Sequence, residues 1–267
     1  MTVIRTPRLA IHARIEGQGP PLLFLGGSST DISLNTPVFD SPLSAAFRIA
    51  TADPRGLGLT EQPGGDWTME DYARDALGLL DALDWERVDV LGESFGGMTA
   101  LHLAGLAPDR VRRLALSVAA PGGPGGRSYP VEEIFALSDP RARAERSLQV
   151  QDRRFAAVPE PERAARIDAR VAQEATFLGH AENANGYPRL LAARAGHDAR
   201  AHLGQIEGPT LVLSGLHDDQ SPLALSERLV AALPRARLSR HDAGHGLLFT
   251  DPTALAAVLA HFKETTP

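Results

Sequence analysis

The chain has 267 residues, no cysteine and a formal net charge of −6. The lack of cysteine excludes a disulfide scaffold, a cysteine-ligated metal site and a thiol nucleophile. The acidic balance argues against a nucleic-acid partner, which would need clustered basic side chains. No apolar run approaches the roughly 20 residues of a membrane span, and residues 1–11 lack the apolar core of a signal peptide. We therefore expect a cytoplasmic protein with no membrane partner.

In the first half of the chain, strand patterns alternate with helix patterns. A helix is expected after Thr68, which forms a capping-box pattern with Asp71, and another over residues 96–106. This alternation is typical of a parallel sheet with helices on both faces. The predicted strands are Thr2–Thr6, Leu9–Glu16, Pro21–Leu25, Phe47–Ala52, Val88–Leu91 and Val111–Val118.

The alternation stops at the Gly/Pro-rich residues 120–126, which lack a lysine and are read as a hinge and not as a phosphate loop. From there to about Leu203, apolar residues recur at helical spacing. A strand pattern resumes at Pro209–Ser214, followed by a helix, a strand at 236–240 and a last helix at 252–262. We predict a core formed by residues 1–121 and 206–267, with a helical cap at 122–205.

The sequence Gly92-Glu93-Ser94-Phe95-Gly96 matches the pattern G-x-S-x-G. The pattern alone is weak, but here it directly follows a predicted strand and directly precedes a predicted helix. A sharp strand-to-helix turn is the context of a nucleophile elbow, in which glycines allow the strained backbone. We interpret Ser94 as a nucleophile. The alternative is a serine that only caps a helix.

A serine hydroxyl needs a neighbouring base and a carboxylate that orients it. Among the nine histidines, His245 lies between two glycines in a loop before the last helix. Asp218 follows the predicted strand at 209–214, with Asp219 as the nearest alternative. The order Ser94, Asp218, His245 is the chain order of one class of serine hydrolases. Gly244, between His241 and His245, argues against a helical metal-binding pair.

These motifs resemble the α/β-hydrolase fold superfamily over nearly the whole chain. Residues 53–60 are similar to its D-x-R-G-x-G-x-S loop, and the insertion lies where the family has a helical cap. Ser94-Phe-Gly-Gly-Met98, Pro108-Asp-Arg-Val111 and Ala195-Gly-His-Asp198 resemble small-ester carboxylesterases and enol-lactonases. The resemblance implies a mostly parallel twisted sheet and a serine hydrolase without cofactor or metal. Its substrate would be a small to medium ester or lactone.

The resemblance also implies an oxyanion hole made of two backbone N–H groups. One belongs to Phe95 and the other to Ser28, in the loop after Leu25. Many relatives have His-Gly where this chain has Gly26-Gly27, which puts the local hydrogen bonding of this loop in doubt. Alternative functions are a C–C bond hydrolase or thioesterase with the same triad, or a ligand-binding protein on a hydrolase scaffold. A homodimer is left open.

Several cap residues have two readings. Aromatic residues are candidates for an apolar wall over Ser94. His180 and Asn183 are read as a solvated helix end, and Arg153 and Arg154 as a charged helix face instead of a substrate-carboxylate site. His197 and His202 are read as cap-to-core packing and not as metal ligands. The aromatic candidates are Phe135, Phe155, Phe177 and Tyr187.

Overall fold

The computed structural model describes residues 1–264, and an eight-stranded sheet forms its centre. The strand order is β1-β2-β4-β3-β5-β6-β7-β8. β2 pairs antiparallel with β1 and β4, whereas the pairs from β4 to β8 are parallel. The prediction of a mostly parallel sheet is therefore confirmed. The strands are β1 (Thr2–Arg5), β2 (Ala10–Glu16), β3 (Pro21–Leu25), β4 (Arg48–Ala52), β5 (Val88–Glu93), β6 (Val111–Ser117), β7 (Thr210–Gly215) and β8 (Ala236–His241).

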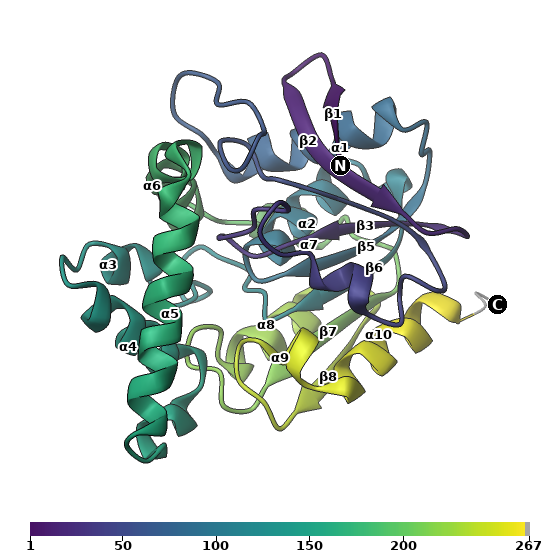
Figure 1. Ribbon diagram of the computed structural model, residues 1–267. Helices are drawn as coiled ribbons and strands as arrows, with labels where there is room; N and C mark the ends of the chain where they lie inside the picture. Colours follow the sequence, from purple (N-terminus) through teal and green to yellow (C-terminus); the bar gives the residue numbers. More distant parts are fainter. Residues whose placement is uncertain (265–267) are drawn as a thin grey trace.

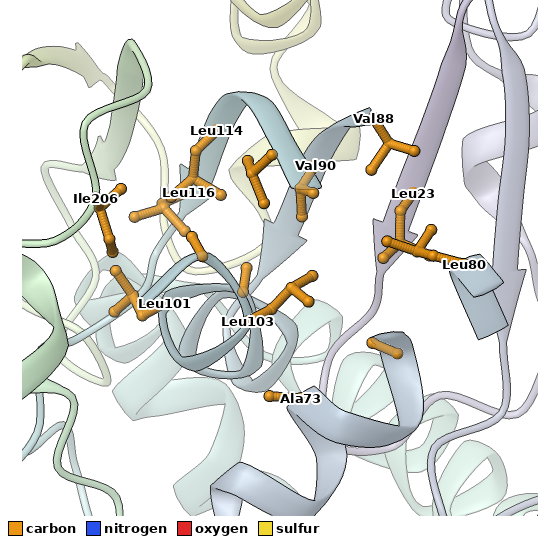
Figure 2. Packing of buried hydrophobic residues seen from close by; sticks show 14 of the residues in the cluster. Leu23, Ala73, Leu80, Val88, Val90, Leu101, Leu103, Leu114, Leu116 and Ile206 are labelled. Atoms are coloured by element: carbon orange, nitrogen blue, oxygen red, sulfur yellow. The ribbon is translucent and has the colours of Figure 1, made fainter. Parts of the chain in front are cut away.

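Helices cover both faces of the sheet (Figure 1). One face packs against α1 (Met69–Ala82), α2 (Phe95–Leu106) and α8 (Leu223–Ala232). Figure 2 shows this layer, in which Leu101 and Leu103 of α2 lie near Val90 of β5 and Leu116 of β6. These side chains are fully buried, and each contributes about 1.5–3 kcal/mol to the hydrophobic core. Burial on two sides explains the apolar residues Val88, Val90 and Leu91 of β5 and the apolar run Leu211–Leu213 of β7.

The opposite face packs against α9 (Leu247–Thr250) and α10 (Pro252–Lys263). Phe24, Leu91 and Leu213 of the sheet belong to this second cluster, together with Leu247 and Val258 of the two helices. Because α9 begins two residues after His245, this packing fixes the end of the loop that carries the predicted base.

Helix α1 begins with the predicted capping box. The Thr68 side chain accepts a hydrogen bond from the Asp71 backbone, and the Asp71 carboxylate accepts one from the Thr68 backbone. Two backbone N–H groups at the helix N-terminus are satisfied in this way. The prediction made from the Thr68 and Asp71 spacing is confirmed.

The insertion after β6 is helical, as its apolar spacing predicts. Figure 1 shows α3, α4, α5 and α6 gathered on one side of the molecule, opposite α10. The two ends of the insertion lie side by side, since Gly122 forms a β-bridge with Asp198 and Ala199 N donates to Pro121 O at 2.9 Å. The last three residues of the predicted segment 206–267 lie outside the described residues. The helices are α3 (Val131–Phe135), α4 (Pro140–Gln151), α5 (Glu162–Gly179), α6 (Ala181–Ala195) and α7 (Arg200–Leu203).

Candidate active site

Ser94 lies at a strained turn between β5 and α2. Its backbone has φ +53° and ψ −113°, a conformation that is costly for a residue with a side chain. The turn is tight because a Cβ atom on Gly96 would lie 2.0 Å from the carbonyl oxygen of Leu25, and one on Gly92 would lie 2.6 Å from Gly96 O. Glycine is therefore required at both flanking positions. Strain of this kind is typical of functional sites, and it projects the Ser94 side chain away from the strand.

His245 and Asp218 meet at this turn. The Ser94 Oγ atom is 2.9 Å from Nε2 of His245, and Nδ1 of His245 is 2.7 Å from Oδ2 of Asp218. Ser94 is 7% exposed, His245 8% and Asp218 0%. The three side chains come from the ends of β5 and β7 and from the loop between β8 and α9. The arrangement can move a proton from a serine hydroxyl to an imidazole held by a carboxylate.

The Asp218 carboxylate is held on its other side as well. Its Oδ1 atom accepts hydrogen bonds from the backbone N–H groups of Gln220 and Ser221, both at 2.8 Å. These bonds fix the orientation of the carboxylate toward His245. Asp219, the alternative considered from the sequence, has a side chain 48% exposed, 3.7 Å from Arg153. The structure thus brings Asp218, and not Asp219, to His245.

Gln220 is a member of this cluster that the sequence analysis missed. Its side-chain nitrogen is 2.7 Å from Nε2 of His245, the same atom that contacts Ser94. Gln220 is 7% exposed. A single glutamine in a loop belongs to no recognisable motif. Only its position two residues after Asp218 could have indicated that it lies near the site.

The segments that carry the predicted oxyanion-hole donors lie side by side. Gly96, which follows Phe95, is packed against Leu25 O and Gly26 O at the end of β3, where the loop with Ser28 begins. Within residues 1–264, the backbone N–H groups of Phe95 and Ser28 donate to no protein acceptor. Two unused backbone donors on segments that pack together at the Ser94 turn are suited to stabilising a developing negative charge.

The loop with Ser28 is tied to the helical insertion by a buried cluster. Asp31 Oδ2 accepts hydrogen bonds from Asn183 Nδ2 and lies near His180 Nδ1, each at 2.9 Å. Asn183 Oδ1 also accepts from Gly58 N at 2.7 Å. Asn183 is 0% exposed. The interpretation as a solvated helix end is therefore wrong for Asn183, because an acidic partner far away in the sequence satisfies its amide. His180 precedes α6 and its side chain is 41% exposed, so it remains in contact with solvent.

On the other side of Ser94, backbone groups join the insertion to the loops of Asp218 and His245. The carbonyl of Gln151 accepts from His245 N at 2.6 Å, and the carbonyl of Val150 accepts from Asp219 N at 3.0 Å. Tyr129 N donates to the carbonyl of Gln220 at 2.8 Å. The end of α4 thus fixes the positions of both loops through main-chain bonds.

Glu93, the residue before Ser94, is a half-buried carboxyl on the last position of β5. Burial raises the pKa of Glu93 to about 7, and the charge of nearby His245 opposes this rise. An acid of this kind changes charge in the pH range in which a histidine base works. The pattern G-x-S-x-G leaves this position open, so the sequence did not single it out.

Three of the four aromatic candidates for a wall over Ser94 contact one another. The ring of Tyr187 lies edge-on to Phe135 at 5.1 Å and to Phe177 at 5.2 Å. This cluster also includes Phe95. Phe155 belongs instead to a separate small core inside the insertion.

The cationic cap residues are occupied by local partners. Arg154 pairs with Asp152 at 2.7 Å and Asp242 at 3.4 Å, and Arg153 donates to the carbonyl of Leu216. These contacts fit the interpretation as a charged surface. Arg154, Asp152 and Asp242 border a cavity of about 880 Å³ between α4 and the His245 loop.

The histidines at the end of the insertion pack against α2. His197 Nδ1 is 3.2 Å from His102 Nε2, and His197 Nε2 is 2.9 Å from the carbonyl of Ala120. Burial lowers the pKa of His102 to about 3 and that of His197 to about 4, which keeps both rings neutral at physiological pH. In the part of the chain that the structure describes, no group of three or more His, Cys, Asp or Glu side chains is placed to hold a metal ion.

Comparison with known proteins agrees with this architecture. A family model described as the alpha/beta hydrolase fold matches residues 20–252. The chain belongs to the α/β-hydrolase family. This match confirms the fold class that the motifs predict. The relatives of this family are hydrolases.

The relatives differ in what their names say they cleave. A poly(3-hydroxyalkanoate) depolymerase from Ectopseudomonas oleovorans is 27% identical, over 91% of this chain and 84% of its own. A 2-hydroxy-6-oxononadienedioate/2-hydroxy-6-oxononatrienedioate hydrolase from Paraburkholderia xenovorans is 32% identical, over 84% of this chain and 76% of its own. The crystal structure of an enol-lactonase from Burkholderia xenovorans has a TM-score of 0.81 and 28% identity, covering 98% of this chain and all of that one.

Among the described helices, none is both long and apolar enough to cross a bilayer.

Proposed function

We propose that the protein is a serine hydrolase that cleaves a small to medium carboxylic ester or lactone through an acyl-enzyme on Ser94. The observation that carries this proposal is the chain of contacts from Ser94 Oγ to His245 Nε2 at 2.9 Å and from His245 Nδ1 to Asp218 at 2.7 Å. The chain starts at a strained turn, where geometry of this kind is expected for a nucleophile.

In the proposed acylation, Ser94 Oγ attacks the substrate carbonyl carbon while its proton passes to Nε2 of His245. The backbone N–H groups of Phe95 and Ser28 stabilise the oxyanion, and each is worth on the order of 3 kcal/mol by analogy. The bond to the leaving oxygen then breaks, and that oxygen takes the proton from Nε2. Asp218 holds the ring in the required tautomer and stabilises the imidazolium.

In the proposed deacylation, a water molecule gives a proton to Nε2 and attacks the acyl carbon. The bond from the acyl carbon to Ser94 Oγ breaks, and Nε2 returns its proton to the serine. The helices at 122–205 serve as a cap that covers the acyl group, with Tyr187, Phe135 and Phe177 as its apolar wall. The depolymerase and enol-lactonase relatives support an ester or lactone substrate.

A test of this function is the steady-state hydrolysis of p-nitrophenyl esters, from acetate to octanoate, by the wild type and Ser94→Ala. We expect the wild type to turn over and the variant to lose at least about 10⁴-fold in kcat. An optimum in acyl length would report the size of the pocket under the cap. Turnover by Ser94→Ala at the wild-type rate would refute the proposal.

A second candidate is C–C bond hydrolysis with the same three residues. It is supported by the relative named as a hydrolase of 2-hydroxy-6-oxo dioates. Assay of a 2-hydroxy-6-oxo-dienoate beside the ester series separates the two. If the wild type is inert on every ester but cleaves the dienoate, the second candidate replaces the first.

A further inference from the structure

We propose that Gln220 is a specificity-determining residue on the leaving-group side of the site, where its side-chain amide donates a hydrogen bond to the leaving oxygen. The inference rests on the proposed function and narrows it to substrates whose leaving atom is a poorly activated oxygen, as in alkyl esters and lactones.

The first step of the argument is that Gln220 is fixed in place. Its backbone N–H donates to Asp218 Oδ1 at 2.8 Å, and its carbonyl accepts from Tyr129 N at 2.8 Å. The residue is 7% exposed, between Asp218 and the proline that precedes α8. Because hydrogen bonds hold the Gln220 backbone on both sides, the side chain can move only a short distance. Its amide therefore stays near His245.

The second step concerns the nitrogen atom that the amide contacts. When Nδ1 of His245 donates its proton to Asp218, Nε2 has a single lone pair. Two donors lie near it: the Ser94 hydroxyl at 2.9 Å and the Gln220 amide nitrogen at 2.7 Å. The amide and the nucleophile therefore share the one acceptor position of Nε2, and the amide N–H lies close to the atom that carries the proton.

The third step follows from the chemistry of the proton. After Ser94 has passed its proton to Nε2, the leaving oxygen must come within about 2.6–3.2 Å of that nitrogen to receive it. The Gln220 amide now occupies a point at this distance. Protonated Nε2 no longer accepts from the amide, so the amide N–H becomes free to donate to the leaving oxygen that approaches Nε2. The attacking water takes the same place in deacylation.

The donor matters most for an alkoxide, which carries a full developing charge on one oxygen atom. A p-nitrophenolate spreads its charge over the ring and needs little help to leave. A carbon leaving group gives the amide no oxygen to bind at this point, and a buried amide without a partner is unfavourable. The position of Gln220 thus favours alkyl esters and lactones over C–C bonds.

The test compares two substrates with the same acyl group, ethyl butyrate and p-nitrophenyl butyrate, by kcat/KM, which reports the steps through acylation. Gln220→Leu removes the donor and keeps a similar volume. We expect kcat/KM for ethyl butyrate to fall about 10- to 100-fold, because one hydrogen bond to a charged group is lost. The value for p-nitrophenyl butyrate should fall by a smaller factor, because nitrophenolate leaves without this donor, so the ratio of the two kcat/KM values is the readout. Gln205→Leu, at an exposed glutamine before β7, is the control for the chemical change.

Gln220→Glu is a second variant, which keeps the shape but presents oxygen atoms to Nε2. It should stabilise the imidazolium and move the lower limb of the pH profile of kcat/KM to higher pH. This readout would not respond to a merely structural role, and it remains available if Gln220→Leu fails to fold.

Equal losses on both esters in Gln220→Leu, or no loss on either, would overturn the inference while the proposed function stands. An unmoved pH limb in Gln220→Glu would also overturn it. If the wild type hydrolyses neither ester, the proposed function fails and the inference fails with it.

Discussion

Two buried histidine–aspartate pairs in this molecule have the same short contact and different surroundings. Nδ1 of His245 is 2.7 Å from Asp218, and Nδ1 of His12 is 2.7 Å from Asp53. All four side chains are at least nine-tenths buried. Only in the first pair does the other ring nitrogen contact a serine hydroxyl, at Ser94.

The second pair instead joins segments of the fold. His12 lies on β2, and Asp53 follows the neighbouring strand β4. The Asp53 carboxylate accepts hydrogen bonds from Ile32 N at 2.7 Å and Leu59 N at 3.0 Å. Burial raises the pKa of Asp53, and these hydrogen bonds oppose the rise. A serine hydroxyl at the free nitrogen is not sufficient by itself, since Nε2 of His241 is 2.9 Å from Ser239 Oγ and its Nδ1 is 2.9 Å from Asp251. The comparison teaches that a buried pair is a structural tie unless a serine on a strained turn, as at Ser94, contacts its free nitrogen.

The largest expected difference between the pairs is in the histidines. His245→Gln should lower kcat at least about 10⁴-fold on p-nitrophenyl esters, because Ser94 loses its base. His12→Gln should lower the free energy of unfolding by about 1–3 kcal/mol through a lost buried hydrogen bond. Its kcat per folded molecule should stay within about threefold of the wild type. Ester kinetics and urea unfolding measure the two effects. A large kcat loss in His12→Gln would show that His12 is not a purely structural residue.

The aspartates should differ in the same direction. Asp218→Asn keeps the shape but no longer favours the tautomer with a proton on Nδ1, so kcat should fall about 10³- to 10⁴-fold. Asp53→Asn should act on stability, by about 1–3 kcal/mol, with a much smaller effect on kcat. The same kinetic and unfolding measurements apply. Similar kcat losses in both variants would mean that the Asp53 pair takes part in the chemistry.

The buried amide of Asn183 tests how much a purely structural hydrogen-bonding group contributes to stability. Its Nδ2 donates to Asp31 and to Phe177 O, and its Oδ1 accepts from Gly58 N. Asn183→Ala leaves buried partners unsatisfied, so the free energy of unfolding should fall by about 1–3 kcal/mol. The exposed Asn185→Ala, two residues later in α6, is the matched control and should change by less than about 0.5 kcal/mol. Equal effects in the two variants would contradict the assigned contacts.

The smallest expected effect is a pH-dependent one at Glu93. The pKa of Glu93 is about 7 in the folded state because of burial, which is above the usual value of a glutamate in an unfolded chain. The folded state therefore binds the proton more tightly, and the cost of burying the charge grows from about pH 4.5 and is complete above about pH 7. Glu93→Gln should raise the free energy of unfolding by roughly 1–3 kcal/mol at pH 8 and hardly change it at pH 5. A difference of equal size at both pH values would refute this titration.

Much of the fold could be predicted because the responsible signals are local. Pro21–Leu25 is found as predicted, since a strand buried on two sides is a continuous apolar run bounded by turns. β5 extends past the predicted Leu91 to Glu93, because the backbone stays extended through Gly92 up to the strained turn. Helix α9 was not predicted, since four residues are too few for a periodic pattern.

At the site, the sequence identified residues that have a motif or a characteristic place at a strand end. Ser94, Asp218 and His245 are such residues, and the structure places them within hydrogen-bonding distance. The contacts of Asn183 and Gln220 were not predicted, because their partners Asp31 and His245 are distant in the sequence. Neither helical periodicity nor residue type indicates such pairings.

The most direct test of the central claim, that Ser94 is the nucleophile of a serine hydrolase, is covalent labelling by an organophosphorus fluoridate. Intact mass and peptide mapping would locate the adduct in the wild type, Ser94→Ala and the control Ser147→Ala, a serine of α4. We predict one phosphonyl group on Ser94 in the wild type and in Ser147→Ala, and none in Ser94→Ala. Labelling of Ser94→Ala at the wild-type rate, or an adduct on another residue of the wild type, would contradict the claim.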